Sequence, residues 1–126
     1  MSGRIVIREG VIDADSADAI LSATPPSQDA EREASLRASF RAGLEDARGR
    51  GCRSVAAPAL GAGRGGLPLQ RCAEILLEEA RLAVADPGRI EEIRFVVAGE
   101  PAFRVFESVQ DATRIAEQME RLARGH

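Results

Sequence analysis

The stretch that decides the fold runs from Ser54 to Pro68 and reads SVAAPALGAGRGGLP. Its opening Ser-Val-Ala-Ala suits a short buried strand, and four glycines follow within the six residues from Gly61 to Gly66. Glycines let the backbone adopt positive φ and approach a ligand without a Cβ in the way. Pro68 suits the first position of a helix, whose N-terminus attracts phosphate. We therefore expect a strand, an anion-binding loop and a helix, in that order.

The loop itself supplies the residues expected to contact the ligand: Leu60, Gly61, Ala62, Gly63, Arg64, Gly65 and Gly66. Arg64 is either a clamp for an oxyanion, through its forked donors, or an ordinary surface arginine. A turn without any ligand is the other interpretation of the loop. Four glycines cost roughly 0.5–1 kcal/mol each relative to alanine, which favours an anion-binding role over a connecting one.

Two other phosphate motifs fit this loop less well. The spacing Gly61-x-Gly63-x-x-Gly66 matches the dinucleotide fingerprint, but that motif needs an acidic residue about twenty residues further on. About twenty residues after the loop a helix is expected, not the end of a strand. The loop also follows the third expected strand, whereas the dinucleotide motif follows the first. The P-loop pattern is absent because the chain contains no lysine.

Apolar runs and helical patterns alternate along the rest of the chain. The expected strands are Arg4–Arg8, Asp18–Ser22, Ser54–Ala57 and Glu92–Val97, and the expected helices are Ser27–Arg48, Leu67–Ala85, a short one from Pro101 and a last one at Asp111–Arg124. Their periodicity assigns Leu36, Phe40, Phe106 and Met119 to the core. This order predicts an α/β three-layer domain with a four-stranded, mostly parallel sheet. The glycine loop then falls at the carboxyl ends of the strands, where open α/β sheets bind ligands.

Composition narrows the class of protein. A chain of 126 residues, 44% hydrophobic and 29% charged, is expected to form one domain over residues 1–126. The net charge of −3 and the scarcity of aromatic residues predict no nucleic-acid partner. No apolar run approaches the roughly 18 residues of a membrane span, and the first residues lack a signal-peptide pattern. We expect a cytoplasmic protein without a membrane partner.

The residues that usually bind metals are few. Cys52 and Cys72 are too far apart for a zinc knuckle or a redox pair, so both are expected to be reduced thiols. Asp13, Asp15 and Asp18 form an acidic cluster that is interpreted as a solvated loop, since no partner at ligand spacing accompanies it. We expect no metal and no cofactor.

Taken whole, residues 54–68 resemble the second ligand loop of macrodomains, the ADP-ribose-binding family. In that family a strand ending in a Pro-Ala-small-Gly run leads into G-x-G-x-x-G-x-P and a helix. The segments Cys72–Ile75 and Ile93–Val97 look like the corresponding helix and final strand, and Arg4–Ala23 resembles the family's opening. The resemblance covers most of the chain. It implies a macrodomain-like fold that binds ADP-ribose or another phosphorylated small molecule.

The chain also departs from the family pattern. In the family the second strand runs into Asn-Ala-Ala-Asn and a glycine-rich first loop, whereas Ser22–Pro26 here passes straight into a helix. The chain therefore resembles a shortened form that lacks the first ligand loop. The family's adenine-binding Asp would fall on Val11, and its stacking aromatic near Ala98, with Phe103 as a substitute.

These departures favour non-catalytic binding. In the family's ADP-ribosyl hydrolases the first loop would position the attacking water, and the only histidine here is the terminal His126. The alternatives are an ADP-ribosyl hydrolase and a degenerate macrodomain that works through self-association. Loss of the middle strands leaves Asp18–Ser22 as an open edge. We expect a homodimer to cover that edge; the alternatives are the Ser27–Arg48 helix and the last helix, with its stripe of Ala112, Ile115, Met119 and Leu122.

Overall fold

The sheet brings together strands from both halves of the chain. The computed structural model describes residues 3–10, 17–21, 32–59, 68–85 and 90–124. Its strands are β1 (Arg4–Glu9), β2 (Ala19–Ile20), β3 (Ser54–Ala57) and β4 (Glu92–Val97). They lie in the order β1-β4-β3-β2, and every neighbouring pair is parallel. The expected α/β class with a parallel four-stranded sheet is confirmed, and β3 is a central strand between β4 and β2.

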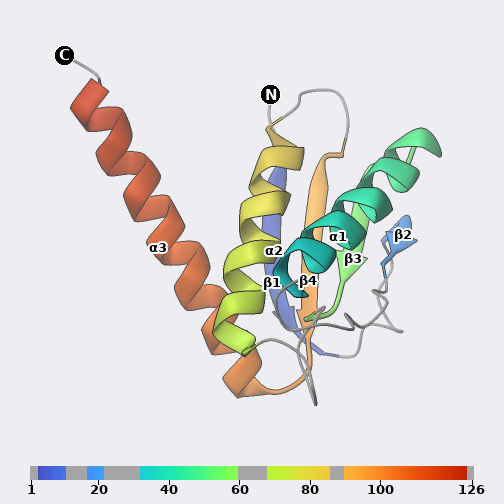
Figure 1. Ribbon diagram of the computed structural model, residues 1–126, viewed down its shortest axis with the longest axis horizontal. Helices are drawn as coiled ribbons and strands as arrows, with labels where there is room; N and C mark the ends of the chain where they lie inside the picture. The colour runs from blue at the N-terminus through green and yellow to red at the C-terminus, as the bar shows by residue number, and fades with distance from the viewer. Residues whose placement is uncertain (1–2, 11–16, 22–31, 60–67, 86–89, 125–126) are drawn as a thin grey trace.

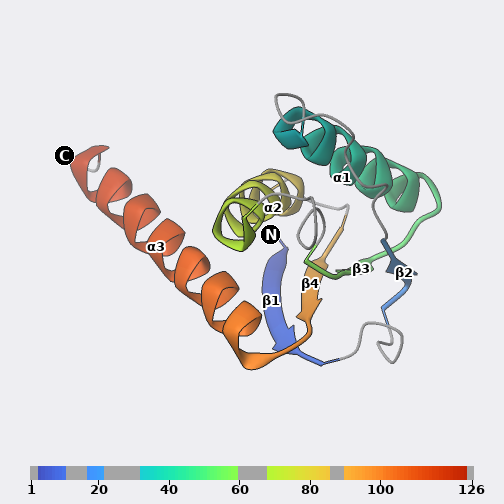
Figure 2. The same ribbon diagram turned by 60° about the horizontal axis from the view of Figure 1, so that its bottom comes forward.

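Two helices cover one face of this sheet. Helix α1 (Arg32–Gly49) joins β2 to β3, and α2 (Leu69–Val84) joins β3 to β4. Both connections step one strand in the same direction, so right-handed crossovers put both helices on the same side. Figures 1 and 2 show them side by side over that face. Leu36 and Phe40 of α1 are buried, as expected from the helical period. The buried stripes also include Leu44 and Ala47 on α1, and Cys72, Ile75, Leu76 and Ala80 on α2.

A row of three phenylalanines ties the layers together. The Phe95 ring on β4 lies 5.9 Å from the Phe40 ring on α1 and 5.5 Å from the Phe106 ring on α3 (Glu100–Arg124), centroid to centroid. All three side chains are buried. Tilted aromatic pairs at these separations add attraction beyond the burial of area. Phe95 is therefore the point at which the sheet and two helices meet.

The C-terminal helix differs from its prediction. A short helix from Pro101 and a second one capped by Asp111 were expected, but residues 100–124 form one continuous helix. No glycine or second proline interrupts the sequence between residues 102 and 124, so nothing ends the first helix. The expectation that Met119 is a core residue is also wrong, because its side chain is 65% exposed. Helix α3 runs beside β1, at the opposite end of the sheet from β2, and so does not cover the β2 edge (Figure 2).

The other face of the sheet carries charged side chains. Side chains alternate between the two faces along β4, so Glu92 and Arg94 lie on the face opposite Phe95. The parallel pairing of β1 with β4 places Arg4 beside Glu92. Glu92 accepts hydrogen bonds from Arg4 Nε at 2.7 Å and from Arg94 Nε at 2.8 Å. Within the described ranges all three helices lie on the Phe95 side or beside β1 (Figure 2).

Ion pairs fasten α1 to α2. Glu79 of α2 is only 4% exposed, and it accepts hydrogen bonds from Arg41 Nε and Nη2 at 2.8 Å and from Arg37 Nη1 at 2.9 Å. Nearer the start of α2, Arg71 Nη2 donates to Glu33 at 2.6 Å. These contacts hold the N-terminal turn and the middle of α2 against α1.

Candidate functional site

The carboxyl ends of the parallel strands meet at one edge of the sheet. Glu9 at the end of β1 pairs with Val97 at the end of β4, and Ala57 at the end of β3 pairs with Phe95 of β4. The Gly10 amide extends the pairing by donating to the Val97 carbonyl at 2.9 Å. Figure 1 shows these ends gathered at the bottom of the view. This edge is the usual ligand side of an open α/β sheet.

The predicted loop leaves and rejoins the described chain at this edge. Strand β3 ends at Ala57, followed by the half-buried Pro58 and Ala59, and the chain returns at Pro68. The seven predicted ligand contacts, Leu60, Gly61, Ala62, Gly63, Arg64, Gly65 and Gly66, lie outside the described residues. Their assignment therefore stays a prediction.

The N-terminus of α2, where the loop ends, has the features of an anion-binding helix start. Pro68 is the N-cap residue and not the first helical residue that was expected, and among the described residues no side chain makes a capping hydrogen bond. The first turn contains no acidic residue. Its free N–H groups and the positive end of the helix dipole are therefore left without a negative partner from the described chain.

A second turn at the same edge follows β4. Gly99 has a φ of +91°, a conformation that favours glycine, and its carbonyl accepts the Phe103 amide at 3.1 Å as α3 begins. Ala98, which stands where the family's stacking aromatic would fall, is exposed but offers only a methyl group. Phe103 is partly buried against the core. Neither residue presents a fully open aromatic ring to a ligand.

Asp18 has a structural role at the amino end of β2 and β3. Its Oδ2 accepts the Arg53 amide at 2.9 Å and the Ser54 amide at 3.2 Å, while its own amide donates to Ser54 Oγ at 2.9 Å. The bond from the Arg53 amide, followed by that from Ser54, lowers the pKa of the Asp18 carboxyl. Asp18 thus fastens β2 to β3. Asp13 and Asp15, the other members of the expected acidic cluster, lie outside the described residues.

Cys52 and Cys72 form no disulfide, and Cys72 is fully buried on α2. Burial raises the pKa of the Cys72 thiol to about 11, so it stays protonated at neutral pH. The described part of the chain holds no group of three or more side chains suited to a metal ion. None of its helices is both long and apolar enough to span a membrane.

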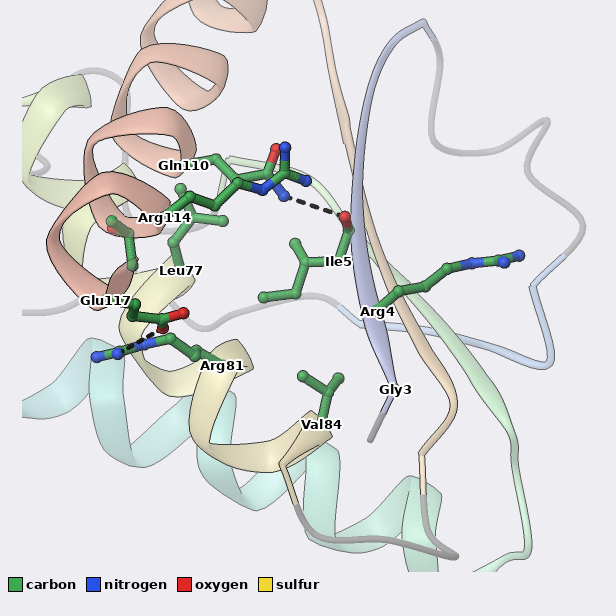
Figure 3. A pocket seen from close by; sticks show the side chains of 10 residues that line it. Gly3, Arg4, Ile5, Leu77, Arg81, Val84, Gln110, Arg114 and Glu117 are labelled. Atoms are coloured by element: carbon green, nitrogen blue, oxygen red, sulfur yellow. Dashed lines mark hydrogen bonds and ion pairs between the residues drawn. The ribbon is translucent and has the colours of Figure 1, made fainter. Parts of the chain in front are cut away.

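A cavity that the sequence did not indicate lies between β1, α2 and α3 (Figure 3). Its volume is about 250 Å³. Ile5, Leu77 and Val84 form an apolar floor, and Figure 3 shows Gln110, Arg114 and the Arg81–Glu117 ion pair around it; the ten lining residues are Gly3, Arg4, Ile5, Leu77, Arg81, Val84, Gln110, Thr113, Arg114 and Glu117. Gln110 Nε2 donates to the Ile5 carbonyl at 3.0 Å and so satisfies one acceptor on the outer edge of β1.

This cavity is not the predicted ligand site. Gly3 and Arg4 lie at the amino end of β1, and Val84 ends α2, so the cavity is at the opposite edge of the sheet from the glycine loop. Its polar residues are scattered over α2 and α3, far apart in the sequence and without a motif. No local signal could have predicted it.

Comparison with known proteins identifies the family. A family model described as the Macro domain matches residues 6–76, more than half of the chain. The chain therefore belongs to the macrodomain family, as the resemblance implied. No curated protein sequence matches it.

Solved macrodomains share the fold at low sequence identity. The Trypanosoma brucei macrodomain in complex with ADP superposes with a TM-score of 0.74 and 18% identity, over 83% of this chain and 68% of that one. The macro domain of ganglioside induced differentiation associated protein 2 superposes with a TM-score of 0.74 and 16% identity, over 85% of this chain and 82% of that one. The Oceanobacillus iheyensis macrodomain with ADP superposes with a TM-score of 0.66 and 15% identity, over 76% of this chain but only 50% of that one. At such identities the likeness establishes the fold, and this chain spans half the length of the Oceanobacillus protein.

Proposed function

We propose that this macrodomain is a binding module for a phosphate-bearing ligand, held by the loop from Leu60 to Gly66. The observation that carries the proposal is the family match, because it spans residues 6–76 and so includes this loop. ADP-ribose and related nucleotides are the first candidates. The Trypanosoma brucei macrodomain, which has the same fold, was crystallised in complex with ADP-ribose and with ADP.

The chemistry of the loop would come mainly from the backbone. Glycine N–H groups followed by a helix N-terminus form a concave set of donors that suits a diphosphate. The uncapped start of α2, with no acid in its first turn, supports this assignment because an anion would take the place of the missing cap. Arg64 would add a forked, charged donor at the middle of the loop.

Binding is expected to be weak. The family's adenine-binding Asp corresponds to Val11, and a charged hydrogen bond of that kind is worth ~1.5–3 kcal/mol. Stacking of a base on an aromatic ring is worth ~1–3 kcal/mol. Loss of both weakens affinity by about two to four orders of magnitude, since each ~1.4 kcal/mol is a factor of ten. A ligand that a full-length relative binds at micromolar concentration would bind here near millimolar.

Binding without turnover is the proposed activity. Hydrolysis would need a positioned water and a general base, but the only histidine is the terminal His126 and the sequence lacks the family's first loop. Incubation with an ADP-ribosylated protein should release ADP-ribose at the rate seen in buffer. Release well above that rate, abolished by a change in the glycine loop, would overturn the non-catalytic assignment.

Titration calorimetry and thermal-shift measurements test the proposal. ADP-ribose, ADP, NAD and inorganic phosphate are compared at millimolar concentrations against three variants. Gly63→Val introduces a side chain into the loop, and Arg64→Ala removes the proposed clamp. Gly49→Ala is the matched control, because a Cβ at Gly49 meets nothing within 4 Å.

The outcomes separate the interpretations. A shift with a nucleotide that Gly63→Val abolishes and Gly49→Ala retains supports the loop as the site. If Arg64→Ala also abolishes the ligand-induced shift, Arg64 is assigned to the clamp. If the shift is unchanged, Arg64 is an ordinary surface residue. The absence of heat and shift with all four compounds would contradict the proposal, as would binding that Gly63→Val leaves intact.

A further inference from the structure

The cavity between β1, α2 and α3 combines an apolar floor with charged walls (Figure 3). Leu77 and Val84 of α2 are buried, Ile5 of β1 is half-buried, and the three side chains form the floor. Sites for small molecules are concave and mainly apolar, with a few polar groups that orient the ligand. The cavity has this composition, and it lies at the opposite edge of the sheet from the glycine loop. A ligand held here is therefore independent of the function proposed for that loop.

The charges on the walls of the cavity do not balance. Arg81 Nη1 of α2 pairs with Glu117 Oε1 of α3 at 2.7 Å. Arg4 also lines the cavity, but its side chain points away in Figure 3 and pairs with Glu92 at 2.7 Å. Arg114 of α3 has no ion pair with a described residue. Among the described residues, the walls therefore carry one positive charge in excess.

The two arginines supply the donors that a ligand would meet. Gln110 Nε2 and Thr113 Oγ1 already donate to backbone carbonyls, each at 3.0 Å. Arg81 Nε, by contrast, is buried and has no hydrogen-bond partner in the described part of the chain, which is unfavourable for a buried donor. Figure 3 shows the Arg114 side chain extending from α3 toward β1, beside Gln110. An acceptor on the ligand would thus find donors above an apolar surface.

We propose that the cavity binds a small carboxylic acid with an apolar body, and that Arg114 anchors its carboxylate. The forked donors of a guanidinium match the two oxygens of a carboxylate. The single negative charge of the acid also balances the excess positive charge of the walls. A dianionic phosphate would place a second, unpaired charge near Glu117 and the apolar floor, which is unfavourable. The apolar body of the acid covers Ile5, Leu77 and Val84 and removes their surface from water.

The size of the cavity limits the length of the acid. Its volume of about 250 Å³ is just below the ~300–1,000 Å³ that is usual for ligand sites. At ~30 Å³ for a group of the size of water, it holds about eight such groups, which is the size of hexanoate. A ligand this small buries little surface, so we expect a dissociation constant near millimolar.

Chemical-shift changes in proton–nitrogen NMR spectra of the 126-residue chain measure the binding. Hexanoate is titrated beside acetate, which lacks the apolar body, hexanamide, which lacks the charge, and inorganic phosphate. The amide signals of Ile5, Leu77 and Thr113 should move with hexanoate. Its dissociation constant should be at least about tenfold lower than those of the other three compounds. ADP-ribose should not displace hexanoate, because the glycine loop is at the other edge of the sheet.

Charge variants identify the anchor. Arg114→Gln removes the charge but keeps much of the side chain, and it should raise the dissociation constant for hexanoate about tenfold. Arg121→Gln is the matched control, because Arg121 is an exposed arginine of the same helix outside the cavity lining, and it should leave binding unchanged. Glu117→Gln removes the opposing negative charge and should lower the dissociation constant about two- to fivefold.

The results distinguish this site from general attraction between charges. Circular dichroism and thermal melting establish that each variant is folded. The proposal would be overturned if hexanoate moved none of the three amide signals, or if hexanamide or phosphate bound as tightly as hexanoate. Equal effects of Arg114→Gln and Arg121→Gln would also contradict it, since neither arginine would then act as a specific anchor. Displacement of hexanoate by ADP-ribose would show a single shared site instead of two.

Discussion

Replacing Glu79 with glutamine tests how strongly the contact between α1 and α2 holds the helix that follows the glycine loop. The carboxylate is 4% exposed and accepts three hydrogen bonds, two from Arg41 at 2.8 Å and one from Arg37 at 2.9 Å. Glutamine keeps the shape of the side chain but removes its charge. Its amide group also turns donors toward the guanidinium groups.

The loss of stability expected for Glu79→Gln lies between two limits. Exposed ion pairs contribute ~0.2–1 kcal/mol, whereas breaking a fully buried pair costs ~3–5 kcal/mol. Glu79 is buried, but the Arg41 side chain is 63% exposed and the Arg37 side chain 27% exposed, so solvent screens both partners and rehydrates them in the variant. We expect the free energy of unfolding to fall by about 2 kcal/mol, which for a chain of this size corresponds to about 7 °C in melting temperature.

The effect should depend on pH in a defined direction. Hydrogen bonds from Arg41 and then Arg37 outweigh the cost of burial and lower the pKa of the Glu79 carboxyl below its ordinary 4.5. A carboxyl whose folded pKa is lowered contributes stability above its unfolded pKa and loses it as the pH falls through the folded pKa. The difference between wild type and Glu79→Gln should therefore be constant near neutral pH and shrink below pH 4.5.

Urea unfolding followed by circular dichroism, at neutral pH and at several acidic pH values, measures both effects. Glu78→Gln is the matched control, because Glu78 is the adjacent residue, its side chain is 48% exposed, and its nearest contact is Arg37 at 3.2 Å. It should change stability by less than about 0.5 kcal/mol. Equal losses for the two variants, or a Glu79→Gln loss that grows as the pH falls, would refute the reasoning.

Three further substitutions probe other parts of the fold. Phe95→Leu removes two ring contacts worth ~0.5–1.5 kcal/mol each and should lower the free energy of unfolding in urea by about 1–3 kcal/mol. Phe103→Leu, outside the row of three phenylalanines, should lower it by less. Equal losses would show that the ring contacts add no stability. Gly99→Ala forces a Cβ into a φ of +91° and should lower stability by about 1–2 kcal/mol, a result that an unchanged melting temperature would contradict. Asp18→Asn should speed hydrogen exchange at the Leu21 amide beside β2, most clearly above the lowered pKa of Asp18, and an unchanged rate would show that Asp18 does not fasten the strand.

Much of the fold could be predicted because its signals are local. Strands β3 and β4 were expected with the bounds that they have, since each is a short apolar run between residues that break secondary structure. The buried stripes of α1 and α2 follow the helical period, and the strand-helix alternation predicts parallel pairing. The candidate site could be predicted in part for the same reason. Glycines and a proline between a strand and a helix indicate an anion-binding loop, and β3 is the central strand that this prediction required.

The sequence by itself thus determined the family, the parallel sheet and the order of strand, glycine loop and helix, because neighbouring residues encode each of these. Only the tertiary structure decided which surfaces find partners. The burial of Glu79 depends on arginines about forty residues away on α1, and the bonds of Asp18 depend on the start of β3. The apolar period of α3 suited a core helix, yet Met119 is exposed because α3 packs beside β1 and no described residue packs against its outer side. A periodic apolar pattern indicates that one face of a helix favours burial. The arrangement of the whole chain determines whether another element of the domain packs against that face.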